Sequence, residues 1–362
     1  MKAGILTFHR ASNYGAVLQT YALQTAISKF GIDCEVIDYE CPHLHQMHSP
    51  LSFLYAKGLK MKLMQLAYIQ VKQRRRKLFA AFVSRKLNLS SSRYIGEKEL
   101  CADGKLANTY DRFIVGSDQV WNPRLTNLDS AYFLSFVEDS IKKTSYAASF
   151  GVSGLSDEVA KVIAEYLDSF SKIYVRENRG ADLVNAMIGK DVPIVLDPTL
   201  LLTPQEWDKF AKKIPQDKYI IVYTIDRSPK LIDFALDLSN KTGLQVIYIN
   251  DSLFRYAKIR YLSVAMPEEW VGLFASAEYV VTNSFHGMAF ALNYNKEVCV
   301  GLSIDKVNHN SRLTSLLEML GIPFDEECGI NNYIDKIDWV NLNFKLDKAR
   351  TESTGYLKDI FS

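Results

Sequence analysis

The sequence lacks any uninterrupted run of about 18 apolar residues, the shortest length that can span a bilayer as a helix. Its first residues, Met1–Phe8, lead directly into a strand-like segment, without the apolar core and small-residue cleavage site of a signal peptide. We therefore expect a cytoplasmic protein. The chain has 362 residues, 48% of them hydrophobic and 23% charged, which favours a globular protein of two domains.

Cysteine is scarce and unpatterned. The five cysteines are scattered, and no Cys-x-x-Cys pair occurs, so the sequence predicts neither a disulfide framework nor a zinc knuckle. One cluster, Cys41, His43, His45 and His48, contains metal-ligating residue types. It has no second half-site at a recognised spacing, so we expect it to be an exposed loop after a strand. We expect no metal and no cofactor.

Several catalytic signatures are also missing. The chain has no Gly-x-Gly-x-x-Gly, no Gly-x-x-x-x-Gly-Lys-Ser/Thr, no His-Glu-x-x-His and no Gly-x-Ser-x-Gly. These absences argue against dinucleotide-dependent enzymes, P-loop enzymes, zinc proteases and serine hydrolases.

Acidic residues are absent between Cys41 and Gly96, where eleven basic residues occur. The rest of the chain carries 32 basic and 41 acidic residues. Within this segment, residues 51–87 interleave apolar and basic side chains, which is typical of an amphipathic helix or helix pair. We expect the apolar face to pack on the N-terminal domain. The functional alternative is peripheral contact with anionic lipid at the inner face of the membrane. No nucleic-acid-binding pattern accompanies the bases, and we expect no nucleic acid partner.

Strand-like and helix-like segments alternate along the chain, which predicts an α/β protein of two Rossmann-like domains facing a cleft. The expected domains are residues 1–200, with a basic helical insertion at 51–90, and residues 201–335. Residues 336–362 form a tail that we expect to be helical and to pack on the N-terminal domain. The predicted strands are Ala3–Phe8, Cys34–Tyr39, Arg112–Val115, Lys143–Ala148, Ile173–Val175, Val192–Leu196, Tyr219–Ile225, Gln245–Asn250, Tyr279–Ser284 and Val298–Leu302.

Polar residues follow several predicted strands, at the edge where open α/β sheets bind ligands. Asn13 and Gly15 begin a helix, where they could cap it or meet an anion. Ser117, Asp118 and Gln119 lie in an expected loop after a strand, and the nearby Trp121, which a plain turn does not explain, favours a functional role.

Arg176 ends another predicted strand. Its guanidinium could grip a carboxylate or phosphate, or form an ion pair with Glu177 or another acid.

The most informative segment is Ser284-Phe285-His286-Gly287, which joins the apolar run Tyr279–Val281 to a helix-like pattern. His286 is thus expected in the first turn of a helix at the carboxyl end of a strand. A helix N-terminus lowers the pKa of a histidine and a bound anion raises it, so His286 could donate a proton once an anionic substrate is present.

Five segments, in this order, resemble the polysaccharide pyruvyl transferase family. They are Asn13–Gln19, Gly116–Asn122, Val175–Glu177, Val195–Thr199 and Ser284–Gly287. The resemblance implies a fold similar to the GT-B glycosyltransferases and a metal-free transfer of the enolpyruvyl unit of phosphoenolpyruvate to a sugar of a surface polysaccharide or exopolysaccharide, forming a pyruvate ketal. The acceptor would be a sugar or a lipid-linked glycan.

The resemblance also implies roles for individual residues. His286 would be the general acid, and Arg176 would bind the carboxylate or phosphate of the donor. Members of the family commonly carry Arg where this chain has Ser284, so another cation, such as Arg179, Arg227 or Lys306, would be needed. Asp118 is the candidate base or sugar ligand, and Gly287 lies in the anion-binding region.

Two other functions stay open. One is a nucleotide-sugar-dependent glycosyltransferase of the same fold, with Glu268 or Glu269 on the ribose. The other is a catalytically altered relative that binds glycans without turnover.

Overall fold

The computed structural model describes residues 1–48, 69–214, 218–226, 228–251, 255–302, 310–324, 332–334 and 337–362. They form two compact units. The first comprises Met1–Leu201 and Ala349–Ser362, and the second comprises Leu202–Lys348. The second unit therefore extends beyond residue 335, where the sequence analysis ends its second domain. The helix α16 (Trp339–Asp359) contributes residues to both units.

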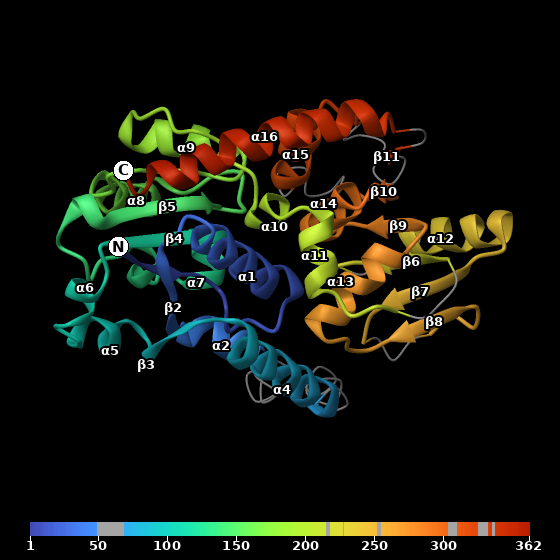
Figure 1. The fold of residues 1–362 in the computed structure, drawn as a ribbon, viewed down its shortest axis with the longest axis horizontal. Helices are drawn as coiled ribbons and strands as arrows, with labels where there is room; N and C mark the ends of the chain where they lie inside the picture. The colour runs from blue at the N-terminus through green and yellow to red at the C-terminus, as the bar shows by residue number, and fades with distance from the viewer. Residues whose placement is uncertain are drawn as a thin grey trace. The chain divides into compact units, whose positions relative to one another are not determined.

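The first unit is built on a parallel five-stranded sheet with the order β3-β2-β1-β4-β5 (Figure 1). Because β1 lies in the middle, the chain adds strands first on one side of it and then on the other, which makes the β1–β4 boundary a topological switch point. The strands are β1 (Lys2–Leu6), β2 (Asp33–Glu40), β3 (Leu89–Ile95), β4 (Arg112–Asp118) and β5 (Lys143–Ala148).

Helices of the first unit cover its sheet, and α1 contacts β2 and β4 (Figure 1). The side chain of Asn13 caps α1 by accepting from the Ala16 N–H at 3.2 Å. The helices are α1 (Tyr14–Ser28), α2 (Pro42–His48), α4 (Ile69–Lys86), α5 (Glu97–Ala102), α6 (Leu106–Thr109), α7 (Pro123–Thr126), α8 (Asp157–Asp168), α9 (Asn178–Ile188), α10 (Pro198–Leu201), and the 3-10 helices η2 (Ser130–Phe133) and η3 (Ser140–Lys142).

The second unit contains a six-stranded sheet with the order β11-β10-β9-β6-β7-β8, parallel except for β11. Its switch point lies between β6 and β9. The strands are β6 (Tyr219–Tyr223), β7 (Gln245–Ile249), β8 (Ile259–Leu262), β9 (Tyr279–Thr282), β10 (Glu297–Val300) and β11 (Asn332–Ile334). The helices, besides α16, are α11 (Pro204–Phe210), α12 (Pro229–Thr242), α13 (Pro267–Ser276), α14 (Phe285–Asn293) and α15 (Ser311–Leu320).

Three local predictions of strands were wrong. Ile173–Val175 and Val192–Leu196 form only single bridges, in which Val175 pairs with Ala148 and Ile194. The strand expected to end at Val115 continues to Asp118, because Gly116 and Asp118 also pair with β5. No strand was predicted at β3, β8 or β11, which lie at or near the sheet edges. The residues of β3, Leu-Ser-Ser-Ser-Arg-Tyr-Ile, carry little apolar character.

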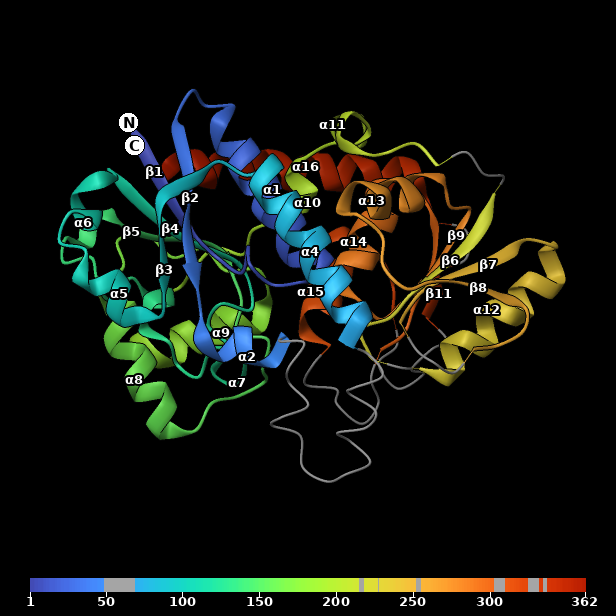
Figure 2. The same ribbon diagram turned by 90° about the horizontal axis from the view of Figure 1, so that it is seen from below.

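The basic segment is described from residue 69 onward, and residues 51–68 lie outside the described residues. There α4 lies beside α1 in the first unit (Figure 2). Its apolar side chains Phe79, Phe82 and Val83 are buried, and the Phe79 ring lies 5.0 Å from that of Tyr14. The expected packing on the N-terminal unit is therefore observed for this helix. In the part of the chain that the structure describes, no helix is long and apolar enough to cross a membrane.

The Cys41 cluster is not an exposed loop. Cys41 is buried, and the following residues form α2, in which Pro42 occupies the first helical position and Leu44 packs inward. His45 is ion-paired with Glu40. Among the described residues, no group of three potential ligands could hold a metal ion.

Candidate active site

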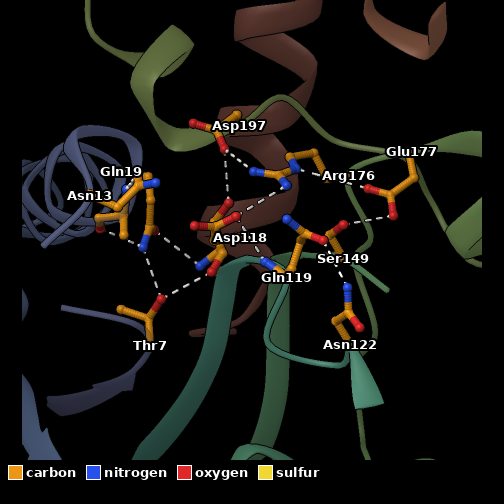
Figure 3. A network of polar contacts seen from close by, with 12 residues as sticks. Thr7, Asn13, Gln19, Asp118, Gln119, Asn122, Ser149, Arg176, Glu177 and Asp197 are labelled. Carbon is orange, nitrogen blue, oxygen red and sulfur yellow. Dashed lines mark hydrogen bonds and ion pairs between the residues drawn. The ribbon is translucent and has the colours of Figure 1, made fainter. Parts of the chain in front are cut away.

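A buried polar network occupies the switch point of the first sheet (Figure 3). Thr7, directly after β1, donates its hydroxyl to the Ser117 carbonyl oxygen at 2.9 Å. Gln19 of α1 donates to the Thr7 hydroxyl at 2.9 Å and accepts from the Ser117 N–H at 3.1 Å. The Ser117 hydroxyl donates to Asp197 at 3.0 Å. These bonds fix the end of β4 and thereby the position of the next residue, Asp118.

Arg176 is the cation of this network (Figure 3). Its Nη1 donates to Asp197 Oδ2 at 2.8 Å, and its Nη2 lies 3.5 Å from Asp118 Oδ1. Glu177 is a more distant partner, at 3.9 Å from Nε, and itself accepts from Ser149 at 2.8 Å. The structure thus shows the ion-pair alternative considered for Arg176, with Asp197 as the nearest acid.

Among the described residues, the charged side chains of this network carry excess negative charge. One guanidinium faces three carboxylates, those of Asp118, Glu177 and Asp197. Burial lowers the pKa of Arg176, but the three acids outweigh it and raise the pKa above its ordinary value. A phosphate or carboxylate would be repelled here, whereas a sugar hydroxyl could donate to an acid.

Asp118 is the acid of the network that solvent can reach, since its side chain is 12% exposed while those of Glu177 and Asp197 are at most 2% exposed. Its backbone has φ of 75°, in the left-handed region that Asp adopts more readily than most residues. The Gln119 N–H donates to Asp118 Oδ1 at 2.9 Å, which orients the carboxylate. The carboxylate is therefore held in place with one edge accessible.

The remaining predicted residues of the first unit have structural contacts. Asn13 caps α1, and Gly15 is buried in the first turn of that helix. Gln119 accepts from Asn122 at 2.8 Å, and a Cβ on Gly151 would lie 1.9 Å from Gln119 Oε1.

Trp121, which favoured a functional role for the preceding loop, has a structural explanation of its own. Its ring is fully buried and stacks on Phe133, while Nε1 donates to the Tyr132 carbonyl oxygen at 3.0 Å. Trp121 is a core residue, which accounts for a large aromatic side chain directly after a loop of small polar residues.

In the second unit, His286 occupies the first turn of α14, directly after β9, as the sequence predicts. Ser284 is the N-cap of this helix: its Oγ accepts from the Gly287 N–H at 3.3 Å. The His286 side chain is 6% exposed and its ring lies edge-on to Phe285. The histidine is thus fixed beside the positive end of a helix dipole.

Hydrogen bonds tie this turn to the neighbouring strand across the switch point. The Thr282 hydroxyl donates to the Tyr223 carbonyl oxygen at 2.6 Å and accepts from the Ser284 N–H at 3.0 Å. Asn283 accepts from the Ile225 N–H at 2.9 Å and donates to the Asp226 carbonyl oxygen at 3.2 Å. The loops after β6 and β9 are therefore joined next to His286.

The cation expected to replace the family arginine is not identified. Arg179 belongs to the first unit, where it lies 3.7 Å from Asp182. Arg227 and Lys306 lie outside the described residues. Of the two acids considered for a ribose, Glu269 accepts from the Met266 N–H at 3.0 Å and from Lys212 at 2.8 Å, so its carboxylate caps α13.

Sequence reasoning did not assign Thr7, Gln19 or Asn283 to the site. Thr7 and Asn283 each directly follow a strand at a switch point. Their position could therefore be recognised only by a reader who already knows the strand order. Gln19 lies inside a helix and gives no such signal, since only the close packing of α1 against β4 brings its amide to Ser117.

Solved structures of similar fold were found. The protein from Listeria monocytogenes assigned as a UDP-N-acetylglucosamine 2-epimerase matches with a TM-score of 0.52 and 11% identity, over 98% of this chain and 90% of that one. A UDP-N-acetylglucosamine 2-epimerase from Rickettsia bellii matches with a TM-score of 0.50 and 10% identity, over 100% and 96%. Because the sequence identities are this low, the matches show the fold alone. They confirm the predicted GT-B-like fold class.

No curated protein matched. The pattern of the polysaccharide pyruvyl transferase family matches residues 13–305, most of the chain, and this range includes Asp118, Arg176 and His286. With the fold and the two polar switch points in place, this match shows that the chain is a transferase belonging to the polysaccharide pyruvyl transferase family.

Proposed function

We propose that the protein transfers the pyruvyl group of phosphoenolpyruvate to a sugar of a surface polysaccharide or exopolysaccharide, forming a pyruvate ketal. The observation that carries this proposal is the position of His286, which is buried in the first turn of a capped helix at the switch point of the second sheet. The chain belongs to the polysaccharide pyruvyl transferase family, and the resemblance implies that His286 matches a histidine that acts as the general acid.

The chemistry needs one acid and one base. His286 gives its proton to the methylene carbon of phosphoenolpyruvate, which leaves an oxocarbenium-like centre on the neighbouring carbon. A sugar hydroxyl attacks that centre and gives its proton to a base, for which Asp118 is the candidate; its alternative role is to bind the sugar. The C–O bond to phosphate then breaks, a second hydroxyl bonds to the same carbon, and its proton passes to the departing phosphate, which closes the ketal. Each positioned acid or base contributes about 10²–10⁴-fold to the rate.

The charges of the polar residues favour a different substrate in each of the two units. The Asp118 network has three carboxylates around one guanidinium, which suits a neutral sugar hydroxyl. The N-terminus of α14 suits an anion, because the helix dipole and backbone N–H groups favour negative charge there. We therefore assign the donor to the second unit and the acceptor to the first, and we make Arg176 a residue that positions Asp118 through their ion pair.

The test is His286→Ala. We expect phosphate release from phosphoenolpyruvate and a suitable glycan to fall about 10²-fold or more. His43→Ala is the matched control, because His43 is a partly exposed histidine on α2 that belongs to neither polar network. Circular dichroism checks that both variants are folded. Full phosphate release by His286→Ala would overturn the assignment.

A thermal-shift comparison separates the proposal from its rivals. Stabilisation by phosphoenolpyruvate and not by UDP-sugars or GDP-sugars supports the pyruvyl donor. The reverse result would indicate a nucleotide-sugar-dependent glycosyltransferase. Glycan binding without phosphate release would indicate a catalytically altered relative.

A further inference from the structure

Two adjoining cavities lie at the carboxyl ends of β1 and β2 in the first unit. They share five lining residues, Arg10, Ser12, Glu40, His45 and Arg76, and so form one site, which we call the Arg76 pocket. The larger cavity has a volume of about 150 Å³. A water molecule takes about 30 Å³ of liquid volume, so this space can hold a group the size of a phosphate.

Asp38 lies beside the pocket and is neutralised by two residues that line it, Arg10 and His9. Arg10 donates through Nε and Nη2 to Asp38 at 2.7 and 2.5 Å, and His9 Nε2 lies 3.2 Å from the same carboxylate. Burial raises the pKa of Asp38, but the hydrogen bonds from His9 and Arg10 outweigh it and lower the pKa below its ordinary value. This pairing fixes the Arg10 guanidinium, and among the described residues it leaves Nη1 for another partner.

The second acid is also paired. Glu40 forms an ion pair with Arg93 and contacts His45 Nδ1, and both partners line the pocket. Arg76 is different: within the described residues it makes no hydrogen bond or ion pair, and it extends from α4 at the pocket. Three arginines therefore face two carboxylates, and the excess positive charge belongs to Arg76.

The pocket adjoins the Asp118 network through one residue. Thr7 lines the pocket, and its hydroxyl donates to the Ser117 carbonyl oxygen directly before Asp118. A sugar whose hydroxyl reached Asp118 could thus place a substituent toward the pocket. The positive charge selects an anionic substituent, and guanidinium groups pair well with phosphate oxygens.

We infer that the Arg76 pocket binds a phosphate or diphosphate group attached to the sugar acceptor. This inference rests on the proposed function for the identity of the acceptor. Such a group can come from a soluble sugar phosphate or from a glycan linked to a lipid diphosphate, and the same cations recognise both.

The experiment measures binding by calorimetry on the full chain, with glucose 1-phosphate as the probe and glucose as its neutral counterpart. We expect the wild type to bind the phosphate and not glucose. Arg76→Ala should weaken the affinity about tenfold or more, because it removes charge-assisted hydrogen bonds. The exposed position on α4 and the high helix propensity of alanine should keep this variant folded.

Arg74→Ala is the matched control. Arg74 is an exposed arginine of the same helix, but two residues turn the helix by about 200°, so it lies on another face and does not line the pocket. We expect it to bind like the wild type. A second arm measures binding to phosphatidylcholine vesicles that contain a polyprenyl diphosphate. If only the vesicles show binding that depends on Arg76, the phosphate comes from a lipid-linked glycan. If glucose 1-phosphate shows binding that depends on Arg76, the phosphate comes from a soluble sugar phosphate.

Three results would overturn the inference: no binding of either probe by the wild type, equal affinity of the wild type and Arg76→Ala, or displacement of glucose 1-phosphate by phosphoenolpyruvate, which would make the pocket a donor site. The titrations need no turnover. They can therefore show phosphate binding even if the His286→Ala test disproves the proposed pyruvyl transfer. Failure of the pocket inference and failure of the proposed function are thus distinguishable.

Discussion

At position 287 only a glycine fits, and the reason is the hydroxyl of Thr282. A Cβ on Gly287 would lie 2.4 Å from Thr282 Oγ1. That oxygen cannot move away, because it donates to the Tyr223 carbonyl oxygen and accepts from the Ser284 N–H. Gly287 thus allows α14 to begin close to β9, so its role at the site is steric.

Gly287→Ala sets two effects of opposite sign against each other. Alanine gains about 1 kcal/mol of helix propensity, whereas the clash costs about 1–3 kcal/mol. We expect a net loss of stability in urea unfolding, together with reduced phosphate release. Gly355→Ala is the control, since Gly355 is an exposed position in α16 with no atom near its Cβ, and it should gain up to about 1 kcal/mol. Stabilisation by both substitutions would contradict the steric account.

The partners of Arg176 could not be predicted from the sequence. An arginine at the end of an apolar segment can bind a ligand or a carboxylate of the protein, and the sequence does not decide between them. The decision depends on Asp197, 21 residues away, and on Asp118, 58 residues away. Only the fold brings these acids to the guanidinium, so the negative charge of the network could not be predicted.

Among the elements, those with strong local signals were predicted closely. The strand Lys143–Ala148 has the predicted bounds, because its residues form a clear strand-like segment. Single bridges at Val175 were taken for strands, since a short apolar run looks the same in either case.

The cap of α14 links element stability to the site. Ser284→Ala removes the hydrogen bond to the Gly287 N–H and should cost about 1 kcal/mol. It should also lower phosphate release, because His286 lies in the turn that this cap fixes. Thermal unfolding and an enzymatic phosphate assay measure the two effects.

Ser156→Ala is the comparison for that prediction. Ser156 is the N-cap of α8, with its side chain accepting from the Val159 N–H. We expect a similar loss of stability with unchanged phosphate release. An equal effect of the two substitutions on turnover would show that the α14 cap has no special relation to His286.

For the whole molecule, the last residues of the chain complete the first unit. Leu357 and Ile360 are fully buried, and the Ser353 hydroxyl accepts from the Leu196 N–H at 2.9 Å. Arg350 donates to the Leu200 carbonyl oxygen at 2.8 Å. The C-terminal part of α16 is therefore part of the core and the hydrogen-bonding pattern of that unit.

Leu357→Ala tests this role. Truncating a fully buried leucine costs about 2–5 kcal/mol, so we expect a lower midpoint for unfolding of the first unit. Phe344→Ala, on the same helix, removes a side chain that is 71% exposed and should change stability by less than about 0.5 kcal/mol. Calorimetric scans of both variants measure the difference, and equal midpoints would show that the C-terminal segment contributes little.

The division of the chain has a consequence for the gene. The first unit is encoded in two pieces that flank a continuous stretch for Leu202–Lys348. In genetic terms the second unit is a cassette with one junction before Leu202 and another after Lys348. Recombination at these two points would exchange the second unit, with His286, and would leave the sequence that encodes the Asp118 network and the Arg76 pocket unchanged.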